Sequence, residues 1–150
     1  MPRPQYFDIV PADVDTDGIA EAQTTEAAGN LLLNGALCDL GAAGQFDIAD
    51  SYPAGIAGVK IAIDSAGDIS GVTFTVTGKD QDGHPITEDI TGVTTTEVQS
   101  TNYWSQITQI AADGAVESNV NVGTVDEVVT NSYPLNWRDT EPTTVAVYDV

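Results

Sequence analysis

Basic side chains are scarce in this chain of 150 residues, which has four Lys and Arg against 23 Asp and Glu. The formal net charge is -19 at pH 7. Binding to a nucleic-acid backbone requires clusters of Lys and Arg, and so does binding to an anionic membrane surface. Because the sequence has no such cluster, we predict that neither nucleic acid nor a membrane is a partner.

Cysteine, histidine and long apolar runs are also scarce. Cys38 and His84 are each the only residue of their type, so one chain can form neither an internal disulfide nor a zinc site rich in nitrogen and sulfur. Cys38 has apolar neighbours and is expected to be a small buried side chain. No run approaches the roughly 18 apolar residues of a membrane span, and the N-terminus lacks the apolar core of a signal peptide. These absences predict a protein made in the cytoplasm of a cell.

The chain also lacks the usual combinations of catalytic residues. There is no Gly-x-Ser-x-Gly motif, and His84 is the only plausible general base for a Ser or Thr nucleophile. Pairs of carboxylates serve glycosidases, but among 23 acidic residues such pairs arise by chance. Aromatic residues make up only 7% of the chain, which is few for a sugar-binding cleft. The sequence therefore predicts that the protein is not an enzyme.

The acidic residues are spread along the chain and do not form a tail. At molar salt the Debye length is about 3 Å, so repulsion between exposed carboxylates is largely screened. One hypothesis is therefore a halophilic protein from a salt-rich cytoplasm. The alternative, an acidic protein from an ordinary host, stays open.

What the sequence has in abundance is alternation of Val or Ile with polar residues. It extends through residues 57–67, AGVKIAIDSAG, and 69–78, ISGVTFTVTG, and period-two patterns of this kind are typical of strands with one buried face. Asp82-Gly83 predicts a reversal, and 85–92, PITEDITG, is expected to return as the partner strand with Ile86 and Ile90 pointing inward.

Further strand-like runs occupy residues 92–100, 103–112, 118–130 and 143–150. Many short strands joined by Gly, Asp and Asn turns predict an all-β, single-domain, antiparallel β-sandwich, and more finely a jelly roll. Prolines punctuate the first dozen residues, so 1–20 are expected to form an extended N-terminal arm and 21–150 the domain. Residues 19–28 are expected to form a short helical turn or a loop, and Asn34-Gly35 to connect a second hairpin.

Asp13, Asp15 and Asp17 are the candidate metal ligands, because they fill the first three ligand positions of an EF-hand-like loop. The twelfth position holds Thr24, where a bidentate Glu is required. Two interpretations stay open: an irregular Ca²⁺ site, or, preferably, a turn in which Asp side chains accept hydrogen bonds from local amides. A weaker candidate is the Asp80 to Gly83 turn.

Aromatic residues are the candidate contact residues. Tyr103, Trp104 and Trp137 are of the types that most often anchor interfaces, and Arg138 beside Trp137 is one of the few cations available for a salt bridge. The alternative is that these aromatic side chains cover the core.

The central segment resembles a group of small structural proteins from tailed viruses of bacteria and archaea. The similarity is carried by SAGDISGVTFTVTGKDQDGHPITEDITG, then by STNYWSQITQI and NVNVGT, and it covers about residues 13–125. The pattern in those proteins reads SAGD-SGV-FT-TG-D-DG--ITE-ITG, followed by ST-Y and V-VGT strands. They resemble capsid cement or decoration proteins, often jelly-roll trimers standing on the virus head.

The resemblance implies a non-enzymatic virion component on the outer capsid surface, whose partners are the major capsid protein and further copies of itself, as a homotrimer. The expected contact residues are Pro2, Arg3, Tyr6 and Phe7 of the arm, with Tyr103, Trp104, Trp137 and Arg138. Two alternatives remain: a tail or neck protein of the same virion, and a Ca²⁺- or carbohydrate-binding module.

Overall fold

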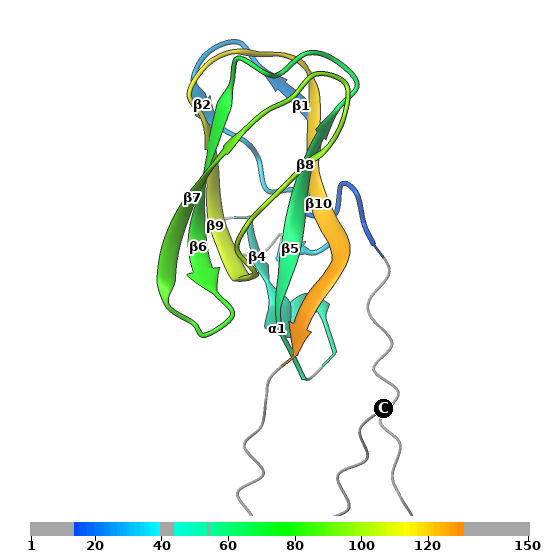
Figure 1. The fold of residues 1–150 in the computed structure, drawn as a ribbon, viewed down its shortest axis with the longest axis vertical. Helices are drawn as coiled ribbons and strands as arrows, with labels where there is room; N and C mark the ends of the chain where they lie inside the picture. Colours follow the sequence, from blue (N-terminus) through cyan, green and yellow to red (C-terminus); the bar gives the residue numbers. More distant parts are fainter. Residues whose placement is uncertain (1–13, 40–43, 54, 131–150) are drawn as a thin grey trace, which may run out of the picture.

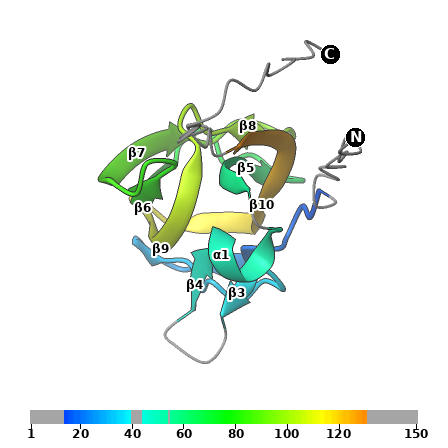
Figure 2. The same cartoon turned by 90° about the horizontal axis from the view of Figure 1, so that it is seen from below.

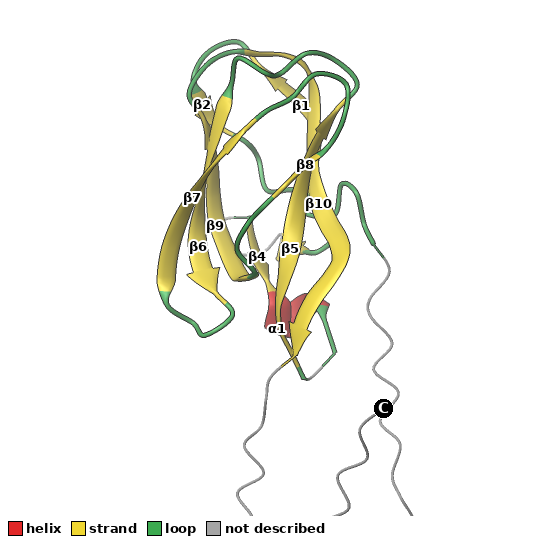
Figure 3. Ribbon diagram, viewed as in Figure 1, coloured by secondary structure: helices red, strands yellow, loops and turns green. Residues whose placement is uncertain are grey.

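The structure is a computed structural model that describes residues 14–39, 44–53 and 55–130 (Figure 1). Nearly all of its regular elements are strands (Figure 3). In chain order these are β1 Ala20–Thr25, β2 Gly29–Asn30, β3 Cys38–Asp39, β4 Gln45–Asp47, α1 Ile48–Ser51, β5 Ile56–Ser65, β6 Thr73–Asp80, β7 Pro85–Thr91, β8 Val98–Gln99, β9 Trp104–Ala112 and β10 Val116–Thr130. Among the described residues, no helix is long and apolar enough to cross a membrane.

The strands form one antiparallel sheet that curls into a half-barrel around the core (Figure 2). On one side β10 lies between β1 and β5, and β8 pairs with β5. On the other side β6 lies between β7 and β9, and β9 also pairs with β2 and β4. The two sides meet where Val59 of β5 pairs with Trp104 of β9. The predicted all-β antiparallel fold is confirmed, whereas the jelly roll stays a prediction.

The core fills the space between the two sides of the curl and is built from the alternating apolar residues of the strands. Thr73, Thr75 and Thr77 of β6 are half-buried, while Phe74 and Val76 between them are completely buried. Burial of these aliphatic and aromatic surfaces is the main favourable term in folding. Among the described residues, the fully buried apolar side chains are Ile19, Ala20, Phe46, Val59, Ile61, Ile63, Ile69, Phe74, Val76, Trp104, Ile107, Ile110, Val116, Val120 and Val122.

The β6–β7 hairpin confirms the expected reversal at Asp82-Gly83. The Asp80 N–H donates to the His84 carbonyl at 3.0 Å, and the Gly83 N–H donates to the Asp80 carbonyl at 3.0 Å. Of the two residues expected to point inward, Ile90 is buried and Ile86 packs partly buried against the core.

Cys38 is buried, as expected. Its thiol donates to the Ile19 carbonyl at 3.2 Å. Burial raises the pKa of this thiol to about 11, which favours the neutral form at physiological pH.

The expected helical turn or loop at residues 19–28 is wrong, because most of this segment forms β1 at an edge of the sheet. Ala20 pairs with Val122 and Gln23 with Val120 of β10. The pairing partner lies a hundred residues away in sequence, and tertiary pairing of this kind overrides weak local propensity.

The arm boundary at residue 20 is also wrong. Asp15 already lies against β10: its carbonyl accepts the Thr124 N–H at 2.9 Å, and its own N–H donates to the Thr124 hydroxyl at 3.3 Å. Ile19 is completely buried. Residues 15–20 therefore belong to the domain, and any arm ends before them; residues 1–13 lie outside the described part of the chain.

Asn34-Gly35 does not connect a hairpin, because β2 pairs with β9 and β3 pairs with β4. Glycine is required at 35 by close approach: a Cβ there would collide with the backbone of Gly18. The Gly35 N–H donates to the Ile19 carbonyl at 3.1 Å. This segment therefore passes beside β1. The glycine of the Asn-Gly pair reflects close contact with Gly18 and not a hairpin turn.

Candidate interaction surface

Six of the eight predicted contact residues lie outside the described residues. These six are Pro2, Arg3, Tyr6, Phe7, Trp137 and Arg138. Their roles stay predictions. Tyr103 and Trp104 are described, and these two neighbours differ in burial.

Trp104 is a core residue, so its interpretation as a surface contact is wrong. It begins β9, pairs with Val59 on one side and with Asp80 on the other, and its side chain is completely buried. Tyr103, the residue directly before β9, is half-buried and reaches the outer surface. The indole N–H of Trp104 has no hydrogen-bond partner among the described residues.

The turn that precedes Trp104, residues 100–103, is fastened to β5 by Ser100. The Ser100 N–H donates to the Ile61 carbonyl at 2.8 Å, and the Ile61 N–H donates to the Ser100 hydroxyl oxygen at 3.1 Å. The same hydroxyl donates to the Asn102 carbonyl at 2.9 Å. Ser100 is only 3% exposed, so these bonds satisfy polar groups that water does not reach.

Glu88 of β7 fastens the other side of the same turn. One carboxylate oxygen accepts the Thr101 N–H at 2.6 Å, and the other accepts the Asn102 N–H at 3.1 Å and its side-chain amide at 3.0 Å. Hydrogen bonds to an ionised acceptor are stronger than neutral ones. The turn is therefore held between the two sides of the half-barrel.

Tyr103 emerges from this fixed turn onto the outer face of β5 and β10. The Lys60 Nζ lies 5.4 Å from the centre of its ring and 2.7 Å from Glu127 Oε2, and the Tyr103 hydroxyl donates to Glu127 at 3.4 Å. The hydrogen bond from Lys60 lowers the pKa of Glu127, and the bond to Glu127 raises the pKa of Lys60. We call Lys60, Tyr103 and Glu127 the Tyr103 patch.

Leu32 is a second surface feature, which the sequence did not identify. Its side chain is 69% exposed, which is unusual for a large apolar residue fixed by hydrogen bonds. The Gln23 amide donates to the Leu32 carbonyl at 2.9 Å and accepts the Leu32 N–H at 2.8 Å. A bidentate bond of this kind holds the main chain while the side chain points to solvent.

Of the predicted Ca²⁺ ligands, Asp15 and Asp17 are described and Asp13 is not. The Asp17 N–H donates to Asp15 Oδ1 at 3.4 Å, which is the local role expected of a turn aspartate. Burial raises the pKa of Asp15. The Ca²⁺ site stays a prediction.

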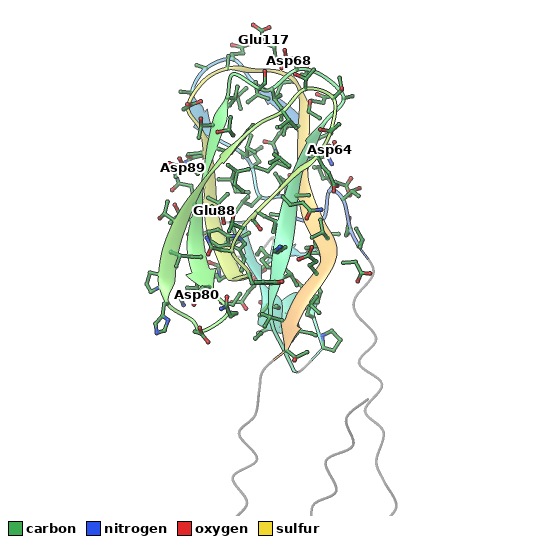
Figure 4. The ribbon with its side chains drawn as sticks, viewed as in Figure 1. Asp64, Asp68, Asp80, Glu88, Asp89 and Glu117 are labelled. Carbon is green, nitrogen blue, oxygen red and sulfur yellow. The ribbon has the colours of Figure 1, made fainter. Side chains whose placement is uncertain are left out.

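The tip of the β6–β7 hairpin gathers a different set of polar groups. Asp80, which is labelled in Figure 4, accepts the N–H of Asp82 at 2.9 Å and the N–H of His84 at 2.8 Å with its Oδ1. Asp80 Oδ2 lies 3.7 Å from His84 Nδ1. The bond from the His84 N–H holds the pKa of Asp80 below its ordinary value. The sequence pointed to the Asp80 to Gly83 turn as a weaker metal candidate but did not join His84 to it; the spacing Asp-x-Asp-x-His across a tight turn was the available signal.

Neither the Tyr103 patch nor the hairpin tip can be assigned by comparison with other proteins. We searched models of protein families, curated proteins and solved structures. None of them matches this chain.

Proposed function

We propose that this chain is a non-enzymatic structural protein of a tailed-virus particle, a decoration protein that binds the outer surface of the capsid. One observation carries the proposal. Several residues of the pattern shared with such proteins form hydrogen bonds or close contacts that hold the described sheet together. The resemblance therefore covers residues that determine this fold.

Asp68 and Gly78 illustrate this correspondence. The Asp68 carboxylate accepts the Ser70 N–H at 3.0 Å and the hydroxyl groups of Ser70 and Thr94 at 2.7 and 3.0 Å, which closes the loops beside β6. Gly78 lies where β6 approaches β9 so closely that a Cβ would collide with the carbonyl group of Gln106. Glu88 and Ser100, also in the pattern, fix the turn that carries Tyr103.

A decoration protein acts by presenting fixed surfaces to its neighbours. The Tyr103 patch is an aromatic side chain beside a neutralised ion pair, and large aromatic residues on fixed backbone are effective interface anchors. Leu32 offers a second apolar anchor. Bound as a homotrimer to adjacent copies of the major capsid protein, the chain would bury such surfaces and resist separation of the shell subunits. The exposed carboxylates would keep the outer face hydrated, in a salt-rich host above all.

Quantitative protein analysis of purified particles tests the proposal. A copy number comparable to that of the major capsid protein supports decoration, whereas the few copies of one ring identify the tail or neck protein. Absence from intact particles would overturn both.

Binding to undecorated shells tests the surfaces. Tyr103→Ala is expected to weaken attachment while the domain stays folded, and Glu117→Ala, an exposed substitution on β10, is the matched control. Deleting residues 1–10 tests the arm separately; full binding after that deletion would remove the arm from the mechanism.

A further inference from the structure

The hairpin tip brings together three side chains whose donor atoms suit a metal ion. One carboxylate oxygen from Asp80, one from Asp82 and one imidazole nitrogen of His84 all lie within 4.8 Å of one another. The imidazole is the observation that separates this group from the many exposed carboxylates of the chain. It is the only one in the sequence, and it folds back over the turn onto the free oxygen of Asp80.

We propose that Asp80, Asp82 and His84 form a surface binding site for a divalent transition-metal ion, of which Zn²⁺ is the representative. The site offers two oxygen donors and one nitrogen donor from a five-residue turn. Water or a donor from a neighbouring molecule completes the coordination.

The donor set selects the class of ion. Imidazole suits zinc, copper and nickel, whereas Ca²⁺ requires six to eight oxygen ligands. Asp80 cannot supply both of its oxygens, because Oδ1 already accepts two backbone N–H groups. A turn with one available oxygen from Asp80 is therefore a poor Ca²⁺ site and an adequate site for a smaller, nitrogen-binding ion.

The base of the turn is fixed, which limits the entropy lost when an ion binds. Asp80 is the last residue of β6, it pairs with Trp104 of β9, and the Ser105 hydroxyl donates to its carbonyl at 2.5 Å. Asp82 and His84 are exposed, so the ion reaches them without opening the fold. The nearest cation in sequence, Lys79, is exposed on the preceding position of β6.

Calorimetric titration of the full chain with Zn²⁺ tests the site. The buffer contains about 1 M NaCl, where the Debye length of about 3 Å suppresses diffuse attraction of cations to an acidic surface. We expect saturable binding at one ion per chain. Amide NMR spectra recorded during the titration are expected to change at residues 80–84 and to leave the Tyr103 patch unchanged.

Two variants and one control decide the assignment. His84→Ala and Asp82→Asn remove exposed ligands without disturbing the core, and each is expected to weaken Zn²⁺ binding by at least about tenfold. Asp89→Asn, on the outer face of the same hairpin, is expected to bind like the original chain. No saturable binding, equal binding by His84→Ala, or Ca²⁺ bound at the tip as tightly as Zn²⁺ would each overturn the proposal.

Discussion

Asp80 and Glu88 belong to the same hairpin, and both carboxylates accept hydrogen bonds from the backbone. The donors lie at very different distances along the sequence. Each accepts two backbone N–H groups. For Asp80 the donors are two and four residues away, within its own turn. For Glu88 they are 13 and 14 residues away, in the turn that precedes β9. Figure 4 shows Asp80 near the tip of the hairpin and Glu88 well above it.

The two carboxylates also differ in whether an oxygen remains available for a further contact. Both oxygens of Glu88 are engaged, so it serves only the framework. Asp80 uses one oxygen for its turn and turns the other towards His84. A local hydrogen bond stabilises only the turn in which it lies, whereas a long-range one fixes two parts of the fold relative to each other. The predictions below test this distinction.

Ser100→Ala is expected to have the largest effect on stability. The substitution leaves the buried Ile61 N–H without an acceptor, which costs about 2 kcal/mol of the free energy of unfolding. Chemical denaturation measures it, and Ser118→Ala, a half-buried serine of β10, is the control. A loss no greater than the control would show that the turn does not depend on this bond.

Glu88→Ala is expected to cost slightly less, about 1.5 kcal/mol, because water can reach the exposed Thr101 and Asn102 once the carboxylate is gone. Glu117→Ala is the matched control, expected to change little. A double-mutant cycle of Glu88 with Asn102 should show coupling, since the two side chains bond directly. Additive effects in that cycle would show that the hydrogen bond between Glu88 and Asn102 does not contribute to stability.

Asp80→Ala is expected to lower the midpoint of thermal unfolding less than Glu88→Ala does, because its bonds lie within one exposed turn. Amide exchange should instead become faster at Asp82 and His84, the two donors that lose their acceptor. If the substitution destabilised the whole domain as much as Glu88→Ala, the local hydrogen bonds of Asp80 would contribute as much to the fold as the long-range bonds of Glu88.

The smallest effect is expected from acid. Hydrogen bonds hold the pKa values of Asp80 and Asp68 below the ordinary 3.8, so both carboxylates stabilise the fold above that pH. Their contribution is lost as the pH falls from 3.8 through the folded pKa values. Denaturation across this range should show a shallower pH dependence in Asp80→Asn than in the original chain; an unchanged slope would exclude the Asp80 contribution.

Alternation and turn chemistry predicted the strands β5, β6 and β7 and the hairpin tip, because those signals are local. The same reasoning failed for β1, whose composition favours a helical turn but whose backbone pairs with β10. It also failed at Gly35, where a glycine needed for close approach to Gly18 resembled a hairpin glycine. The sequence could not tell that Trp104 lies in the core while Tyr103 contacts Lys60 and Glu127, because that depends on how the turn before β9 is held against the rest of the sheet.

The sequence by itself determined the all-β class, the acidic character and the reversal at Asp82-Gly83, because composition and period-two patterns act over a few residues. Tertiary structure alone decided that Glu88 and Ser100 hold one turn, that Tyr103 lies over Lys60, and that His84 returns to Asp80. The physical reason is that a hydrogen bond or ring contact depends on distance in space, and a curled sheet brings together residues that the chain keeps far apart.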